Sequence, residues 1–242
     1  MQRQSINNLL KSLVLIGLGL PMLSSADASA KPARFGDALS VLTAKVTLPA
    51  EFEGGHKTLA VYCQTDVQKS GLLANTQCYQ KPRIANLQQQ TLDALASATF
   101  EPATVGSTAV PVRMQFRVIY SRSGDQPDMV LLPNLGTLQN EYGVSYFAPQ
   151  ERLDQEPWFQ HYVKNDWAKG QAFFADGRLT RVMGVVSPDG EVAEVSTLDA
   201  RGSGKRDASV VEDALKQSRF IPGFVENQPT EMHYVAVLNY AK

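Results

Sequence analysis

The alternation of apolar and polar residues predicts three strands in the first half of the chain. Residues 110–120 give the cleanest strand, because every second side chain is apolar and most of the others are polar. This period predicts one dry face and one wet face. Residues 59–67 alternate in the same way, Ser70-Gly71 turns the chain, and residues 72–79 return as the second strand of a hairpin.

A helix is predicted between the hairpin and the last of these strands. Asn86 is a residue type that caps helix starts, and the leucines that follow lie close to one helical face. Pro102 prevents the helix from continuing. Upstream, residues 41–48 predict a further strand. The first half therefore reads hairpin, helix, strand.

The second half repeats this plan with a constant offset of about 120 positions, which indicates an internal duplication. Matching landmarks are Asp93 and Asp213, Phe100 and Phe220, and Pro102 and Pro222. Residues 181–186 and 191–198 predict a hairpin around a turn at 187–190. Ser209 opens the predicted helix, and residues 232–240 form the last strand. Val235 and Val237 make the second face of this strand apolar as well, which predicts that another part of the protein covers that face.

The pattern predicts an α+β fold of two tandem small domains. Each domain is a three-stranded antiparallel sheet with one helix packed on it (ββαβ). The first domain spans 31–120 and the second spans 172–242, and an ordered, aromatic-rich segment, 121–171, connects them, with a short helix at 156–164. The residues expected to anchor the two cores are Phe100, Pro102, Phe220 and Pro222.

The first thirty residues have the pattern of a secretory signal peptide. Two basic residues precede an apolar run at 13–20, and Ala28-Ser29-Ala30 offers small residues for cleavage, so the mature chain is expected to begin at Lys31. The uncharged run of about fifteen residues is shorter than the roughly twenty that span a bilayer. We therefore expect a periplasmic protein with no stable membrane insertion after cleavage.

An oxidising compartment allows the two cysteines of the chain to pair. Cys63 and Cys78 lie at nearly equal distances from the turn at 68–71, where residues that face each other across a hairpin lie. A bridge that closes so short a loop contributes about 3 kcal/mol to stability. The spacing of a redox-active Cys-x-x-Cys pair is absent.

Composition and motifs give no indication of catalysis. A net charge of −1 gives no electrostatic basis for binding nucleic acid. His56, His161 and His233 have no metal-ligand spacing, and Gly202-Ser203-Gly204-Lys205 lacks the Ser or Thr that a phosphate loop requires. We expect no catalytic residues, no metal site and no cofactor.

The second copy resembles the TonB carboxyl-terminal domain family. The resemblance rests on Arg219-Phe220-Ile221-Pro222 after Asp213-Ala214-Leu215, and on Val186-Ser187-Pro188-Asp189-Gly190 before them, and it covers about sixty residues. The first copy is a weaker match, with Thr99 in place of Arg219. The resemblance implies a periplasmic domain that takes a short receptor segment as an added strand. An energy transducer of this family would keep an uncleaved membrane helix and a proline-rich spacer, which the sequence lacks.

These observations favour a non-catalytic periplasmic binding or adaptor protein of the Gram-negative envelope. Its partner would be an envelope protein or peptide that pairs with an exposed sheet edge. The edge residues expected to contact it are Met232, His233, Tyr234, Val235, Val237 and Tyr240.

Three alternatives stay open at this stage. The repeats could pack edge to edge as a structural pseudo-dimer within an envelope complex, or the chain could be a TonB-type transducer or a hydrolase. A free edge distinguishes the peptide-binding protein from the pseudo-dimer, because final strands that pair with each other leave no edge for a peptide.

Overall fold

A computed structural model describes residues 29–48, 58–80, 86–123, 126–155, 179–200 and 204–239. Within these ranges, antiparallel sheets combine with four helices, which confirms the α+β class. The helices are α1 (Ala38–Lys45), α2 (Leu87–Leu95), α3 (Gln139–Tyr142) and α5 (Gly204–Gln217). None of them is long and apolar enough to cross a membrane.

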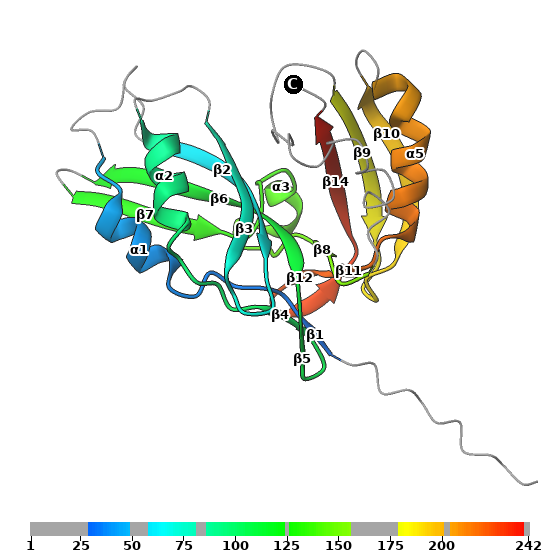
Figure 1. Cartoon of the computed structure of the whole chain (residues 1–242), viewed down its shortest axis with the longest axis horizontal. Helices are drawn as coiled ribbons and strands as arrows, with labels where there is room; N and C mark the ends of the chain where they lie inside the picture. The colour runs from blue at the N-terminus through cyan, green and yellow to red at the C-terminus, as the bar shows by residue number, and fades with distance from the viewer. Residues whose placement is uncertain are drawn as a thin grey trace, which may run out of the picture.

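The first sheet is built on the strands that the apolar alternation predicts. Strands β2 (Thr58–Val67), β3 (Leu73–Gln80) and β6 (Val112–Ser123) pair antiparallel in the order β3-β2-β6. Helices α1 and α2 cover one face of this sheet (Figure 1). The disulfide predicted between the strands of the hairpin is present and joins Cys63 of β2 to Cys78 of β3.

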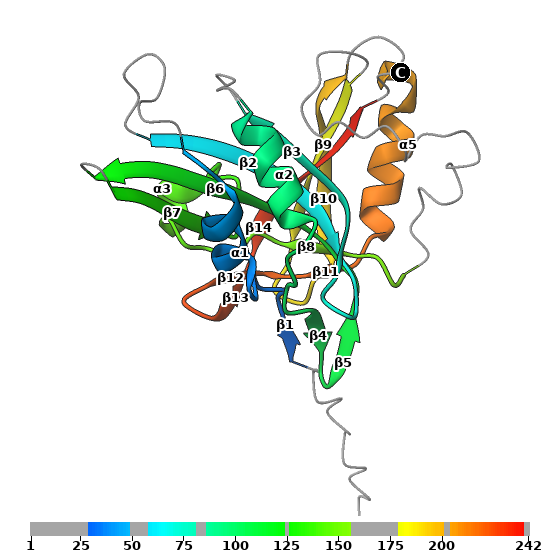
Figure 2. The same cartoon turned by 60° about the vertical axis from the view of Figure 1, so that its left-hand side comes forward.

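The second sheet has the order β10-β9-β14, from β9 (Leu179–Val186), β10 (Val192–Ala200) and β14 (Met232–Asn239). All three strands pair antiparallel. Helix α5 packs along β9 and β10 on one face of this sheet, as Figure 2 also shows.

The first sheet does not end at three strands. Strand β7 (Gln126–Leu132) pairs with the second half of β6, and β8 (Gln150–Arg152) pairs with its start. On its other edge β8 pairs with β11 (Phe220–Ile221), which follows helix α5. A strand from the connecting segment therefore joins the second half of the chain to the first sheet.

Two small hairpins occupy equivalent places after α2 and α5. They are β4 (Ala103–Val105) with β5 (Thr108–Val110), and β12 (Gly223–Val225) with β13 (Gln228–Thr230), each strand of the second hairpin 120 positions after its counterpart (223 − 103 = 120). An upstream segment pairs with each. Strand β1 (Ala30–Lys31) places Lys31 opposite Thr104, and Phe147 forms a bridge to Phe224, so the correspondence extends upstream of both hairpins.

Both phenylalanines expected to anchor a core are buried. Phe100 is 2% exposed, and its ring centroid lies 5.8 Å from that of Phe116. Phe220 is 4% exposed and lies 4.7 Å from Tyr234. Of the two prolines, Pro222 is buried and Pro102 is half-buried.

The first core also contains residues from the second half of the chain. Ile221 and Phe224, which follow helix α5, pack in the cluster that includes Phe100 and Phe116. The two sheets are therefore not independent packing units.

Three local predictions differ from the structure. Residues 41–48 were expected to form a strand, but α1 covers most of them, because Ala38 and Leu42 are spaced to bury one helical face. Helix α5 begins at Gly204, ahead of the predicted start at Ser209. Asn86 does precede α2, but it adopts φ 60° and makes no side-chain capping hydrogen bond.

The described part of the connecting segment is packed against the first sheet through β7 and β8. Its two tryptophans and the helix expected at 156–164 lie outside the described residues, as do residues 1–28 of the expected signal peptide. Ala30, the last residue of that expected peptide, belongs to β1 and pairs with Val105 of β4.

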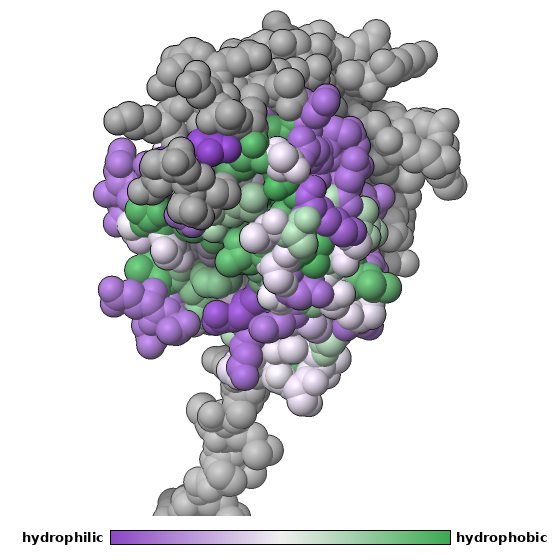
Figure 3. All heavy atoms as spheres, turned by 90° about the vertical axis from the view of Figure 1, so that its left-hand side faces the viewer, coloured by the Kyte–Doolittle hydropathy of each residue, from purple (hydrophilic) through white to green (hydrophobic). Residues whose placement is uncertain are grey.

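Apolar side chains gather among polar ones on the face that carries α1 (Figure 3). Leu39 of α1 and Val130 of β7 are among the exposed large apolar residues, at 45% and 42%. This face lies on the far side of the molecule from β14 (Figure 1).

Gly71 and Gly190 are predicted to be equivalent and essential for the turn geometry. They have φ of +82° and +77°, and in each a Cβ atom would lie 2.1 Å from the carbonyl oxygen of the buried phenylalanine, Phe100 or Phe220. Replacing either glycine with alanine should destabilise the protein by more than about 2 kcal/mol, since backbone strain alone costs about 1–3 kcal/mol.

Gly143 is the control, because it has φ +79° but a Cβ atom there meets nothing within 4 Å. Gly143→Ala should cost less than the other two substitutions in urea unfolding. Equal losses at all three positions would show that contact with the phenylalanine carbonyl does not matter.

Candidate functional site

The polar face of the first sheet is buried, although its sequence pattern predicts a wet face. Gln115 of β6 is 5% exposed, and Gln64 of β2 is 7% exposed. Gln115 Nε2 donates a hydrogen bond to Gln64 Oε1 at 3.3 Å and another to the carbonyl oxygen of Val235 at 3.2 Å. Strand β14 of the second sheet therefore lies against this face, in place of solvent.

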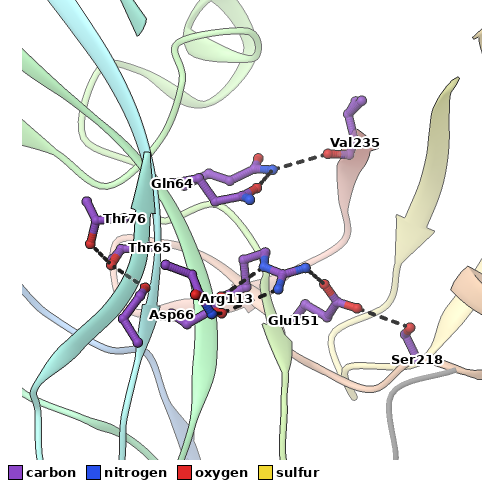
Figure 4. A network of polar contacts seen from close by, with 11 residues as sticks. Gln64, Thr65, Asp66, Thr76, Arg113, Glu151, Ser218 and Val235 are labelled. Atoms are coloured by element: carbon purple, nitrogen blue, oxygen red, sulfur yellow. Dashed lines mark hydrogen bonds and ion pairs between the residues drawn. The ribbon is translucent and has the colours of Figure 1, made fainter. Parts of the chain in front are cut away.

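An ionic cluster lies two residues away from Gln115 on the same face (Figure 4). Arg113 Nε donates to Asp66 Oδ1 at 2.9 Å, and Arg113 Nη1 lies 3.5 Å from Glu151 Oε2. Glu151 belongs to β8, and its Oε1 lies 3.5 Å from the hydroxyl of Ser218, which follows α5. One arginine therefore links the first sheet, the connecting segment and the second half.

Burial shifts the pKa of two groups in this cluster. Removal from water raises the pKa of Glu151 above its ordinary value, and the nearby charge of Asp66 adds to the effect, whereas Arg113 and hydrogen bonds from Ser218 and Tyr234 oppose it. Burial also raises the pKa of Tyr234 well above its ordinary value, and the negative charge of Glu151 is the next largest cause. With two carboxylates around one arginine, a proton on Glu151 removes the excess negative charge.

The position of Glu151 is unsuited to acid–base chemistry on a ligand. Glu151 is 4% exposed and Tyr234 is 2% exposed, so the groups with shifted pKa are enclosed by protein. A general acid or base must come within hydrogen-bond reach of a substrate. We interpret the cluster as the junction that fixes one sheet against the other. Among the described residues, no group of three or more His, Cys, Asp or Glu side chains could hold a metal ion.

Strand β14 is an outer strand of its sheet, and in the described part of the chain β9 is the strand that pairs with it, while Gln115 and Tyr142 contact carbonyl groups at Val235 and Glu231. It pairs with β9 on one side only, whereas β6 has β2 on one edge and β7 and β8 on the other. In an antiparallel ladder, the N–H and C=O of one residue point to the same side. Because the carbonyl of Val235 accepts a bond from Gln115, the backbone groups of residues 233, 235, 237 and 239 point away from β9.

The other long outer strands carry features that discourage pairing. The ladders of β3 and β10 have register shifts, and β7 contains Pro127, which has no N–H to donate. Strand β14 keeps its register with β9 over eight consecutive residues. It is the most regular edge in the described part of the chain.

The structure divides the residues expected to contact a partner. Met232 and Tyr234 are 1% and 2% exposed, so their side chains belong to the core and cannot contact a partner. His233 is exposed and Val235 is half-buried. The side chain of Val237 and the whole of Tyr240 lie outside the described residues.

Sequence reasoning missed Arg113, Gln115 and Glu151 as members of a site. A period of two identifies the polar face of a strand, but it does not distinguish a face covered by water from one covered by protein. Glu151 lies in a strand of three residues, which is too short for a periodic signal.

Comparisons of this chain with protein-family models, with curated proteins and with solved structures found no match.

Glu151→Gln should change how stability depends on pH. The raised pKa means that folded Glu151 keeps a proton that the unfolded chain releases above its ordinary pKa of 4.5. This contribution to stability is present in full below pH 4.5 and is lost as pH rises through the folded pKa, at a rate of at most about 1.4 kcal/mol per pH unit. Glutamine does not titrate, so the variant should gain stability relative to the unmodified protein between pH 5 and pH 8.

Urea unfolding across this pH range measures the difference. Glu101→Gln is the control, because Glu101 is exposed. If the two variants track the unmodified protein in parallel, Glu151 is ionised in the folded state and the cluster carries a full excess charge.

Proposed function

We propose that the protein is a non-catalytic binding or adaptor protein of the Gram-negative periplasm that takes an extended segment of an envelope protein as an added strand on β14. The observation that carries the proposal is the regular outer edge of β14, with backbone groups of four residues directed away from β9. Such an edge gives affinity through main-chain hydrogen bonds to an incoming strand.

Three features support this site. The chain leaves β14 uninterrupted while it shifts the register of β3 and β10. The exposed side chain of His233 lies at the start of the edge, where a partner could reach it. The resemblance of the second copy to the TonB carboxyl-terminal domain, in which a receptor segment adds as a strand, points to the same mode.

We infer that the two halves arose by duplication of one ββαβ unit. In the described part of the chain, only the second copy has a final strand that pairs with a neighbour on one side alone. In the first copy the matching edge of β6 holds β7 and β8. The edge-to-edge pseudo-dimer is the weaker candidate, since β6 and β14 belong to different sheets.

A photoreactive side chain at His233 should form an adduct with an envelope protein in cell extracts. The same group at Glu194, exposed on the outer strand β10, serves as the matched control and should give no such adduct. Val235→Pro should abolish the His233 adduct, because it removes an outward N–H and leaves the bonds to β9 intact.

His233→Pro, with the photoreactive group moved to the exposed Glu231, repeats this test at the neighbouring outward N–H. Circular dichroism and thermal melts check that each variant folds. An adduct that forms equally from β10, or that survives both prolines in folded protein, would contradict strand addition to β14.

A further inference from the structure

Arg117 is a buried arginine without an acidic partner in the described part of the chain. It is 9% exposed, its Nη2 donates to the neutral Gln139 Oε1 at 2.9 Å, and its Nε has no hydrogen-bond partner. None of the ion pairs among the described residues includes it. Arg113, four residues earlier on the same face of β6, has two carboxylates.

The loop before α3 is shaped around the Arg117 guanidinium. Gly136 has φ +79°, which favours glycine, and a Cβ atom there would lie 2.2 Å from Nη1 of Arg117, so any side chain at this position would displace the guanidinium. Asn134 Oδ1 accepts the N–H of Gly136 at 2.9 Å, which holds the turn in place. Helix α3 then supplies Gln139 as the acceptor for Nη2. The charge is thus held by a specific local structure that offers it only neutral acceptors.

A buried charge without a counter-ion is costly, and buried arginines are ordinarily paired. The guanidinium presents its donors in a planar fork that matches the two oxygens of a carboxylate. An arginine held in this way, with no anion beside it among the described residues, has the geometry of a carboxylate site that a second molecule could complete.

Arg117 also lies between two residues that contact β14 or the residue before it, Gln115 on the same strand and Tyr142 on the helix that binds its guanidinium. It is the next side chain after Gln115 on the same face of β6, about 7 Å further along the strand, and Gln115 reaches the outward carbonyl of Val235. On the other side, the hydroxyl of Tyr142 in α3 donates to the carbonyl oxygen of Glu231 at 3.1 Å, immediately before β14. A strand added along this edge of β14 would replace the contact of Gln115 with Val235 and would lie beside β6 and α3.

We propose that Arg117 binds a carboxylate of the strand that adds to β14, either an acidic side chain or the C-terminal carboxylate. This inference rests on the proposed function, and it adds a specificity: the partner segment is extended and carries one carboxylate that enters the site formed by Arg117, Gly136 and Gln139.

The first test uses acetate as the probe on the full chain labelled with ¹⁵N-arginine. The Nε–Hε resonance of Arg117, assigned with Arg117→Lys, should shift saturably with sodium acetate and not with sodium chloride. Arg113 is the internal control and should not respond, because Asp66 already occupies its Nε. Absence of an acetate-dependent shift at Arg117 would overturn the proposal.

The second test uses ten-residue peptides of alternating valine and threonine with one glutamate or one glutamine, each with a free or an amidated C-terminus. Fluorescence anisotropy should show at least fivefold tighter binding for the peptides that carry a carboxylate. The amidated glutamate peptide and the free glutamine peptide distinguish a side-chain carboxylate from a terminal one.

Gln139→Glu is the decisive variant, because it places an internal carboxylate on the guanidinium. It should raise the melting temperature, abolish the acetate shift and remove the preference for glutamate over glutamine, while binding of the neutral amidated peptide stays unchanged. Gln139→Ala is the control and should keep both the shift and the preference.

The outcomes separate the two proposals. Equal binding of acidic and neutral peptides would overturn the role of Arg117 and leave strand addition standing. Failure of every peptide to bind would overturn strand addition of such segments, and with it the role of Arg117 in recognising one.

Discussion

The buried polar cluster of Arg113, Asp66 and Glu151 is the interaction on which the arrangement of the two halves depends. Asp66 and Arg113 lie on neighbouring strands of the first sheet, and Glu151 lies on β8, which also pairs with the strand that follows α5. Buried ions tolerate little displacement, since the loss of one partner leaves the other uncompensated in a medium of low dielectric. The cluster therefore fixes how the second half sits on the first sheet.

The same row of side chains on β6 performs three tasks in sequence. Arg113 is neutralised by Asp66, Gln115 contacts the outward edge of β14, and Arg117 has a neutral acceptor, Gln139, among the described residues. The row thus passes from a closed junction to a group that an external carboxylate can satisfy. This gradation explains why a face that reads as solvent-exposed in the sequence is enclosed at one end and is proposed to bind a partner at the other.

The sequence was sufficient for the elements that depend on periodicity. The strands β2, β3, β6 and β9, the disulfide and the burial of Phe100 follow from local alternation and spacing. Elements that depend on partners distant in the chain could not be predicted in this way.

Short strands illustrate the limit. Strands β8 and β11 have three and two residues, and only their neighbours make them strands. Residues 41–48 predict a strand although α1 contains most of them, because a short run of scattered apolar side chains fits both periods. The edge of β14 was predicted, but the guanidinium beside it was not, because the fold alone brings the loop at Gly136 to Arg117.

Amide hydrogen exchange along β14, in the protein without any partner, tests the central claim most directly. An open edge leaves the N–H groups of His233, Val235 and Val237 without strand partners, while those of Tyr234 and Ala236 bond to β9. Fast exchange is expected at the first three positions and slow exchange at the other two. Uniform protection along the strand would mean that the edge is already paired, and it would contradict the account.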